Sequence, residues 1–523
     1  MTLRSRLLAV AVAAAGLSVA GCGAAHKSGS SGGGGAGGSS DVLGIPYLAD
    51  MSVPDPDVFY DIEGNSVILS TYEGLLKYAP ESTKIVGSLA SSWTVSPNRL
   101  TYTFKLRPGV RFHDGTPLTA QAVKRSFTRR LAVGQAPAYM VKPIASMLTP
   151  DPATFVVHLK HPVNPFLAYM ASSWGPKIIG PNALVQHAGS DHAETYLHTH
   201  DDGTGPFTLT AFMRGRQYTL TRNASYWGAK PSFREVLIKI TPDIGTQRLE
   251  LQNGDLDAVL HSFPASEIAS LPSSLTVKRA PSFLRLLLYV NTHKSPFTDA
   301  GVRAGLRQTI AVDQLVSQAY AGTATKSTGP YPPGLLPGQP PLPYSPDPAG
   351  AKTVASRAKT KAITLAYTAD ESGVLRRASE LLQAQLTAAG YQVTLKEVQL
   401  PQVYGFVKNL GSAPDMLITT NTPDAAHPDT WARILFYGSG GLNFMGFKDP
   451  TLDAQLDRAV SAPQAQATTL YKQAGQRIID SNSLFFLGDV KDTFVLRKDL
   501  ADVQHVAAYP WMMNFAALRR GAG

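Results

Sequence analysis

The residues whose types suit metal chemistry best lie in a histidine-rich segment that ends at residue 202. The segment contains four histidines followed by two acids: His187, His192, His198, His200, Asp201 and Asp202. Imidazole and carboxylate groups are common metal ligands. Their spacings fit no compact coordination site, however, and the pattern is typical of a solvated surface loop with titrating side chains. We therefore expect no metal site here, with metal binding by this patch as the alternative.

Two further acids, Asp255 and Asp257, have a spacing that would suit acid–base chemistry, but a turn role is favoured. Gly203-Thr-Gly-Pro is not a phosphate loop, because no Gly-Lys-Ser/Thr follows it. The chain also lacks HExxH and Gly-x-Ser-x-Gly motifs. The sequence therefore predicts that the protein is not an enzyme and needs no cofactor.

A third set of candidates follows an apolar stretch, Met416–Thr420, that has the composition of a strand. In open α/β lobes, ligands bind beyond the carboxyl ends of such strands. The segment after this strand contains Asp424, His427 and Trp431. Asp424 is expected to face a ligand or, alternatively, to cap a turn. Trp431 is expected to form an apolar wall, and a core position is the alternative.

The N-terminus has the features of an export signal. Arg4 and Arg6 precede an apolar run, Leu7–Ala20, which ends in small residues before Cys22. This ending resembles a bacterial lipobox, so residues 1–21 are expected to be a lipoprotein signal peptide and Cys22 to carry lipid. The alternative is a free cysteine after an ordinary signal. Cys22 is the single cysteine, which excludes a disulfide framework.

Residues 22–40 are rich in Gly and Ser and are expected to be a flexible tether. The net charge of the chain is +10, and removal of Arg4 and Arg6 lowers it to +8. No basic run with interleaved aromatics accompanies this charge, so we expect no nucleic-acid partner.

Alternation and helical periodicity predict the elements that position these residues. Tyr102, Phe104 and Leu106 alternate with polar residues as a strand does, and Thr119 is expected to cap the helix that follows. Residues 363–398 are expected to form a βαβ unit, with a helix that Gly390 ends. A parallel crossover of this kind indicates an α/β lobe.

Several motifs, in order along the chain, resemble family 5 of the bacterial extracellular solute-binding proteins, the dipeptide, oligopeptide and nickel-chelate binding group of ABC importers. They include Leu89-Ala90-x-x-Trp93, Phe112-His-Asp-Gly115, Asn223-x-x-Tyr226-Trp227, Leu118-Thr-Ala120 and Tyr72-Glu-Gly-Leu-Leu76. The resemblance covers nearly all of residues 41–518. It implies a two-lobed, periplasmic-binding-protein-like (type II) clamp with mixed sheets, in which the first lobe is discontinuous and enlarged by an extra subdomain.

The implied domains are lobe I, residues 41–290 plus 485–523, with the extra subdomain at about 86–202, and lobe II, residues 291–484. The implied function is a lipid-anchored, monomeric component that binds a peptide between closing lobes outside the cytoplasm. Its implied partners are an ABC permease with its ATPase subunits, and the outer face of the cell membrane through the lipid on Cys22.

The resemblance also implies site residues. Asp424 matches the aspartate that binds a peptide's α-ammonium, whereas His427 replaces the usual acid before Pro428. Asn443 lies in the family's late asparagine loop, and Tyr72 begins the motif near the first strand. Dipeptide-binding relatives hold the ligand carboxylate with an arginine in the loop before residue 374. Here that loop is Thr-Ala-Asp-Glu-Ser, which favours an oligopeptide over a dipeptide, or a cationic solute.

Three alternatives stay open at this point. One is an enzyme, which a peptidase assay would reveal. Another is an envelope lipoprotein that keeps the fold but regulates through a protein surface. The last is a carrier of a metal chelate, haem or another cationic solute.

Overall fold

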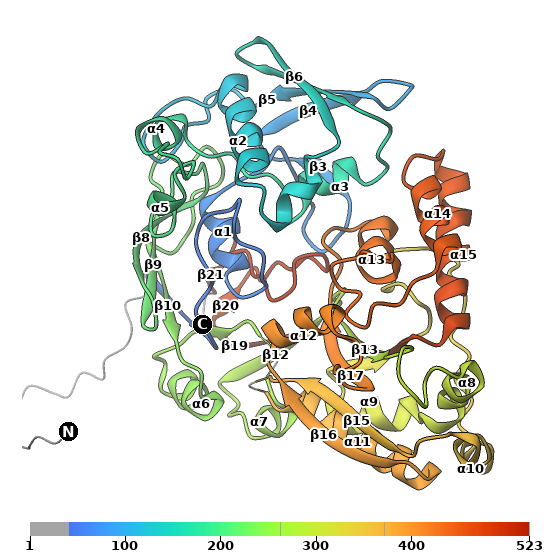
Figure 1. Cartoon of the computed structure of the whole chain (residues 1–523). Coiled ribbons are helices and arrows are strands. Elements are labelled where there is room, and N and C mark those ends of the chain that lie inside the picture. Colours follow the sequence, from blue (N-terminus) through green and yellow to red (C-terminus); the bar gives the residue numbers. More distant parts are fainter. Residues whose placement is uncertain (1–40, 262, 371, 522–523) are drawn as a thin grey trace, which may run out of the picture. The chain divides into compact units, whose positions relative to one another are not determined.

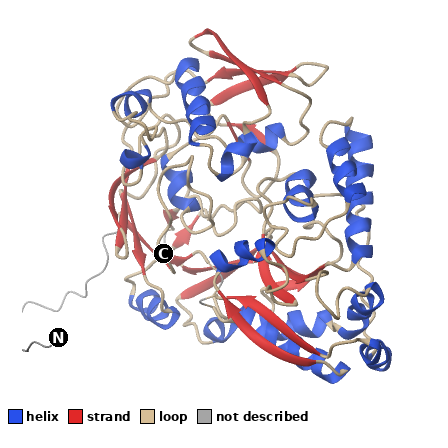
Figure 2. Ribbon diagram, viewed as in Figure 1, coloured by secondary structure: helices blue, strands red, loops and turns tan. Residues whose placement is uncertain are grey.

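The computed structural model describes residues 41–261, 263–370 and 372–521. The predicted signal peptide, Cys22 and the Gly/Ser tether lie outside these residues. Within them, no helix combines the length and the apolar character that crossing a membrane requires. Helices and strands both occur throughout the described part of the chain (Figure 2), as the sequence predicted for an α/β protein.

The sheet that carries the Asp424 segment has six strands (Figure 1), in the order β14-β18-β13-β17-β15-β16. Their bounds are β13 Arg285–Val290, β14 Ala324–Lys326, β15 Ala362–Thr368, β16 Gln392–Val398, β17 Met416–Asn421 and β18 Leu484–Val490. β15 is parallel to both β16 and β17, and the other pairs are antiparallel. The predicted mixed sheet is therefore confirmed.

The predicted βαβ unit is present as β15, helix α11 (Val374–Ala389) and β16. Leu375, Leu382 and Leu386 of α11 are buried and belong to one apolar cluster, as helical spacing predicted. Gly390 ends the helix in the left-handed conformation, at φ 111°. Helix α11 packs on β15 and β16. The short loop between Thr368, at the carboxyl end of β15, and Val374 leads into this helix.

A second sheet has four antiparallel strands, in the order β4-β5-β7-β6. Their bounds are β4 Ala90–Val95, β5 Thr101–Leu106, β6 Ile144–Asp151 and β7 Thr154–Leu159. Tyr102, Phe104 and Leu106 are the buried residues of β5, as their alternation predicted. Thr119 caps helix α2 (Ala120–Val133) by accepting a hydrogen bond from the backbone N–H of Ala122. Helix α2 packs against β6 and β7.

The other strands form four smaller groups. A four-stranded sheet has the order β1-β10-β9-β8, with β1 Val42–Tyr47, β8 Phe207–Met213, β9 Gln217–Arg222 and β10 Glu235–Ile240. A three-stranded sheet has the order β11-β19-β12, with β11 Ala258–Val259, β12 Leu275–Ala280 and β19 Asp492–Arg497. Two pairs complete the set: β2 Leu76–Tyr78 with β3 Ile85–Gly87, and β20 Leu500–Ala501 with β21 Arg519–Arg520.

The remaining helices connect these sheets. Before β13 they are α1 Asn65–Thr71, η1 Ala136–Met140, α3 Phe166–Ala171, α4 Pro181–Gln186, α5 Glu194–Leu197, α6 Ile244–Asn253 and α7 Ala265–Ala269. After β13 they are α8 Ala300–Thr309, α9 Val312–Tyr320, α10 Pro348–Arg357, α12 Leu400–Gly405, η2 Phe406–Lys408, α13 Pro428–Phe436, α14 Pro450–Ala459 and α15 Gln464–Ser481.

Two comparisons with the sequence predictions follow from these elements. The histidine-rich segment directly follows helix α4 and contains the short helix α5, so part of it is helical where we expected a surface loop. The chain changes sheet between β12 and β13 and again between β18 and β19. The predicted lobe boundaries at residues 290 and 485 fall close to these changes and stay predictions.

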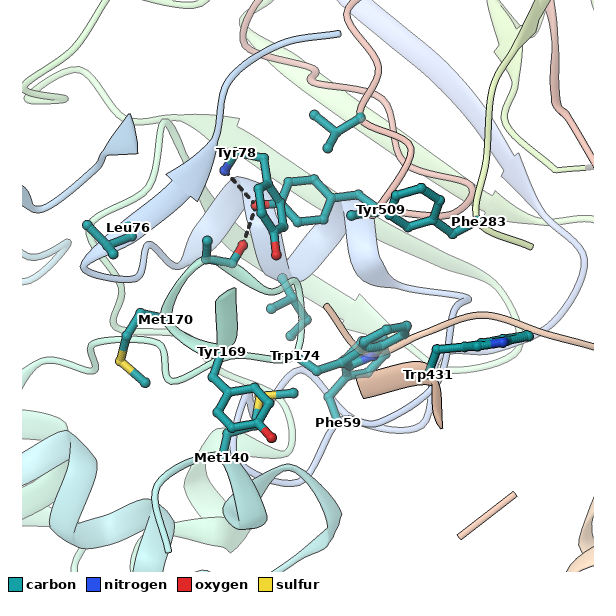
Figure 3. Packing of buried hydrophobic residues seen from close by; sticks show 14 of the residues in the cluster. Phe59, Leu76, Tyr78, Met140, Tyr169, Met170, Trp174, Phe283, Trp431 and Tyr509 are labelled. Carbon is teal, nitrogen blue, oxygen red and sulfur yellow. Dashed lines mark hydrogen bonds between the residues drawn. The ribbon is translucent and has the colours of Figure 1, made fainter. Parts of the chain in front are cut away.

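Aromatic side chains from distant parts of the sequence share one buried cluster. Figure 3 shows Phe59, Trp174, Tyr169 and Trp431 in this cluster. Near them, the hydroxyl of Tyr509 accepts a hydrogen bond from the backbone N–H of Tyr78 and donates one to the carbonyl of Ala171. Residues that follow β19 are thereby fixed against residues from the first third of the chain.

Candidate functional site

The loop between β17 and α13 brings Asp424 into a buried position. β17 ends at Asn421, and α13 begins at Pro428 after His427 as its N-cap. Proline suits the first position of a helix, because its missing N–H has no partner there in any case. Asp424 therefore lies beyond the carboxyl end of a strand, at the position that the sequence predicted for a ligand contact.

Three segments from elsewhere in the chain converge on Asp424. Its Oδ2 accepts hydrogen bonds from the hydroxyl of Tyr60 at 2.6 Å and from that of Tyr139 at 2.5 Å. Its backbone carbonyl accepts a further bond from the hydroxyl of Ser172. By contrast, Oδ1 receives no hydrogen bond from any residue that the structure describes. One carboxylate oxygen is thus held by the protein and the other lacks a donor.

Burial dominates the electrostatics of this carboxylate. Asp424 is only 5% exposed. Burial raises its pKa to about 6, while the hydroxyls of Tyr139 and Tyr60 act in the opposite direction. A carboxylate that has lost its water gains strongly from a charge-assisted hydrogen bond to a cation. The site is therefore suited to an ammonium group that reaches Oδ1.

Aromatic rings surround this carboxylate. The ring of Tyr60 lies 5.8 Å from that of Trp174, edge to face, and the ring of Tyr139 lies 5.5 Å from that of Tyr169. Burial, and then the charge of Asp424, raise the pKa of the Tyr60 hydroxyl well above its usual value, so the hydroxyl stays a donor. Aromatic side chains give a low-dielectric wall and, through their faces, attract cations.

His427 lies close to Asp424 in sequence but is occupied by the helix that it caps. Its Nδ1 accepts a hydrogen bond from the backbone N–H of Asp429 at 3.1 Å. Burial lowers the pKa of His427 to about 4, so the imidazole is neutral at physiological pH. The acid that follows Pro428, Asp429, binds Arg433 at 3.1 Å and the hydroxyl of Tyr471 at 3.0 Å. A ligand contact by His427 stays a prediction.

The other predicted site residues have structural partners. Trp431 is fully buried and donates from its indole nitrogen to the carbonyl of Pro330 at 2.8 Å. The side-chain amide of Asn443 donates to the carbonyls of Tyr437 and Phe447, and so holds its own loop. These contacts favour the core alternative for Trp431, and roles of Trp431 and Asn443 in ligand binding stay predictions.

Tyr72 lies in a separate buried cluster with Ile179, Leu184 and Leu197, next to helices α4 and α5. Burial, followed by the charges of nearby acids, raises the pKa of its hydroxyl well above the usual value. The hydroxyl finds no hydrogen-bond partner among the described residues. Its predicted ligand contact also stays a prediction, since the structure does not bring Tyr72 together with Asp424.

Segment 55–60, which precedes helix α1, divides into two parts. Asp55 and Asp57 are buried in ion pairs with Arg129 at 2.6 and 2.8 Å, and Asp57 also binds Arg130 at 2.8 Å. These pairs attach the segment to helix α2. Only Tyr60, at its end, reaches Asp424. The buried ion pairs therefore position the tyrosine and leave its hydroxyl to the site.

The histidine-rich segment is organised by stacking. The ring of Tyr196 lies between those of His187 and His200, with centroids 3.8 and 4.5 Å away and nearly parallel planes. Within residues 41–261, 263–370 and 372–521, no three His, Cys, Asp or Glu side chains are arranged to hold a metal ion. The acids that end the segment bond elsewhere: Asp201 to His113 at 2.5 Å and Asp202 to the backbone N–H of Asp114.

A cavity of about 80 Å³ lies at the carboxyl ends of β15 and β17. Thr420 of β17 contributes to its wall, together with Asp370 and Ser372 from the loop after β15. Trp511 and Phe263, from outside the six-stranded sheet, also line it. Sequence reasoning predicted the loop but missed Trp511, because no local pattern marks it.

Comparisons with known proteins identify the family of the chain. A probable D,D-dipeptide-binding periplasmic protein, DdpA, of Escherichia coli (strain K12) is 29% identical over 474 residues, which cover 88% of this chain and 90% of DdpA. The binding protein DppA of Helicobacter pylori, solved with the peptide STSA, shares the fold with a TM-score of 0.79 at 23% identity, covering 92% of this chain and 98% of DppA.

A third protein, NikA of Brucella suis, solved with Fe(III)-EDTA, has a TM-score of 0.80 at 21% identity and covers 92% of this chain and 99% of NikA. These structures confirm the predicted type II, two-lobed fold class. The model of the bacterial extracellular solute-binding proteins, family 5 Middle, matches residues 84–443. The chain thus belongs to family 5 of the bacterial extracellular solute-binding proteins, which bind their substrates without transforming them.

Proposed function

We propose that this protein captures peptides for an ABC importer, with Asp424 binding the α-ammonium group, and delivers them to a membrane permease that works with ATPase subunits. The observation that carries the proposal is the asymmetry of the buried carboxylate. Tyr60 and Tyr139 both donate to Oδ2, and Oδ1 receives no bond from the described residues. An ammonium group on Oδ1 supplies the missing donor and neutralises a charge that burial disfavours.

Two similar proteins support a peptide ligand. DdpA is described as a probable D,D-dipeptide-binding protein, and the Helicobacter pylori neighbour was solved with a four-residue peptide. The acidic loop at residues 368–372 favours an oligopeptide over a dipeptide as the ligand. The resemblance to dipeptide-binding members of the family implies an arginine for the ligand carboxylate in this loop, where the chain instead has Asp370 and Ser372.

Isothermal titration calorimetry with three- and four-residue peptides tests the proposal. We expect saturable binding of peptides with a free N-terminus and none of the same peptides after N-acetylation. Asp424→Asn should weaken binding by about 2–5 kcal/mol, because a buried ammonium then lacks its counter-charge. Asp313→Asn is the matched control, since its carboxylate is exposed and pairs with Lys326. Equal affinity of wild type and Asp424→Asn would remove the peptide assignment.

The proposal includes a lipid anchor on Cys22 that holds the monomeric protein on the outer face of the cell membrane. The sequence around Cys22 carries this part, and the tether that follows would let the binding domain move away from the membrane. Cys22→Ala should release the protein from the membrane fraction. Mass spectrometry of the wild-type N-terminal peptide should show acyl chains, and an unmodified cysteine would refute the anchor.

A further inference from the structure

The end of helix α14 is capped by residues from a distant part of the chain. Helix α14 ends at Ala459, and the last carbonyls of a helix have no partner within the helix itself. Here the four successive carbonyls of residues 459–462 accept hydrogen bonds from two residues, Arg99 and Asn164. We call this set of contacts the clasp.

Arg99 supplies the charged part of the clasp. Its guanidinium donates to the carbonyl of Ser461 at 2.6 Å and to that of Ala462 at 2.9 Å. It also donates to the side-chain oxygen of Asn164 at 2.5 Å and thereby orients that amide. Among the residues that the structure describes, no carboxylate pairs with Arg99. The cation is thus committed to the end of the helix, where it also interacts favourably with the helix dipole.

Asn164 supplies the other donors of the clasp. Its side-chain amide donates to the carbonyls of Ala459 at 2.8 Å and Ala462 at 3.0 Å. Its backbone N–H donates to the carbonyl of Val460 at 2.8 Å. The ring of Pro165 restricts the backbone of Asn164 to extended conformations, which limits the directions that these donors can take.

The turn between β4 and β5 fixes the position of Arg99. The backbone N–H of Arg99 donates to the carbonyl of Ser96 at 2.8 Å, and its φ of 58° lies in the left-handed region. A residue other than glycine costs free energy in that region and persists there where surrounding contacts determine its conformation. The hydrogen bonds from the guanidinium to the end of α14 are contacts of this kind.

The clasp joins the same two parts of the molecule that meet at Asp424. Arg99 and Asn164 belong to the sheet β4-β5-β7-β6, one in the turn between β4 and β5 and the other in the segment after β7. Tyr139, which donates to Asp424, lies in η1 just before β6 of that sheet. Helix α14 packs against α13, which follows the Asp424 loop, and against α15 (Figure 1). By the predicted boundaries, the clasp therefore connects the extra subdomain of lobe I with lobe II.

We propose that Arg99 and Asn164 are positioning residues for solute binding, because their clasp holds the two lobes in the closed arrangement. Contacts that exist only in the closed form stabilise that form by their own free energy. The measured dissociation constant is that of the closed form divided by the fraction of molecules that are closed. The clasp therefore raises affinity and slows release without touching the ligand. The proposal rests on the function proposed above, in which the lobes close on a ligand.

The double variant Arg99→Ala/Asn164→Ala tests the clasp, with tri-alanine as the probe. Tryptophan fluorescence follows release of the probe, since Trp174 lies beside Tyr60 at the site. We expect release to become at least about fivefold faster, while the association rate stays within about twofold, because fewer molecules are closed. Small-angle X-ray scattering of the protein without peptide should give a larger radius of gyration for the variant, and saturating tri-alanine should restore the wild-type radius.

Two further variants separate positioning from a general loss of stability. Arg99→Lys keeps a cation at the carbonyls and should recover part of the slow release. Arg111→Ala/Asn182→Ala is the matched control from the same predicted subdomain, because Arg111 donates to the carbonyl of Gly115 and Asn182 to Asp114, all on the exposed surface. The control should leave both the release rate and the radius unchanged.

A double clasp variant that melts at a lower temperature but keeps the wild-type release rate and radius would show a purely structural contact and overturn the proposal. If tri-alanine does not bind the wild type, the peptide function fails instead. The scattering comparison then decides the clasp alone, and equal radii of wild type and double variant overturn it.

Discussion

Replacing Asp424 by Asn is expected to stabilise the ligand-free protein at neutral pH while it weakens peptide binding. Burial raises the pKa of Asp424 from 3.8 to about 6, so folding favours the protonated carboxyl over the carboxylate. This contribution to stability is fully present below the unfolded-state pKa and is lost as the pH rises through about 6. An asparagine side chain is neutral at every pH and still offers one oxygen to the hydroxyls of Tyr60 and Tyr139.

The size of the effect follows from the change in pKa. A rise from 3.8 to about 6, at about 1.4 kcal/mol per pKa unit, makes the buried carboxylate unfavourable by about 3 kcal/mol at pH 7.5. At pH 4.5 the same linkage leaves about 1 kcal/mol, because the folded protein is then almost fully protonated at Asp424. The gain in unfolding free energy from Asp424→Asn should therefore fall to about one third as the pH is lowered from 7.5 to 4.5.

Thermal unfolding of the ligand-free wild type and Asp424→Asn at pH 7.5 and 4.5 measures this difference. The melting temperature of the variant should be a few degrees above that of the wild type at pH 7.5, and this difference in melting temperature should be smaller at pH 4.5. Asp313→Asn, at an exposed ion pair, should show a smaller change with no such pattern. A variant that melts lower than the wild type at pH 7.5, or a gap that is equal at both pH values, would refute the reasoning.

Four other predictions use the same contacts. Peptide affinity should fall about tenfold between pH 7.5 and 5 in calorimetry, because an ammonium binds only the ionised form of Asp424, whose pKa is about 6. Tyr139→Phe removes a donor that lowers this pKa, so the midpoint of that pH profile should move upward. Arg130→Met leaves Asp57 buried with one fewer cation and should destabilise the protein by about 3–5 kcal/mol in denaturant unfolding. Thr119→Ala removes a helix cap and should reduce the unfolding free energy by about 1 kcal/mol, without change in peptide affinity.

Features with a local cause were predictable from the sequence. The alternation in β5, the cap at Thr119 and the Gly390 stop each depend on a few neighbouring residues, and all three are confirmed. The βαβ unit at 362–398 was also recognisable, because its helix is long and strongly periodic. The resemblance to family 5 then supplied the arrangement of the sheets, which no local pattern specifies.

The contacts of the site were predictable only in part. Asp424 follows a strand that the sequence indicated, but its partner Tyr139 is 285 residues away in a short 3-10 helix without any recognisable motif. Tyr60 follows two acids that bind Arg129 and Arg130, and no local pattern marks its hydroxyl as a partner of Asp424. Contacts between residues so far apart depend on how the sheets pack, and a single sequence does not contain that information.

The same burial explains both the raised pKa of Asp424 and its suitability for an ammonium ligand. Removing water from a carboxylate disfavours its charge in the free protein, and a cation that enters the site recovers this free energy as affinity. The hydroxyls of Tyr60 and Tyr139 moderate the effect by bonding one oxygen, which keeps the group ionised at neutral pH with a pKa of about 6. A fully satisfied carboxylate would gain little from a ligand, and an unsupported one would be protonated. In Asp424 the described residues donate hydrogen bonds to Oδ2 and none to Oδ1, so the carboxylate is neither fully satisfied nor unsupported. This is the arrangement expected of a carboxylate that binds a cation reversibly.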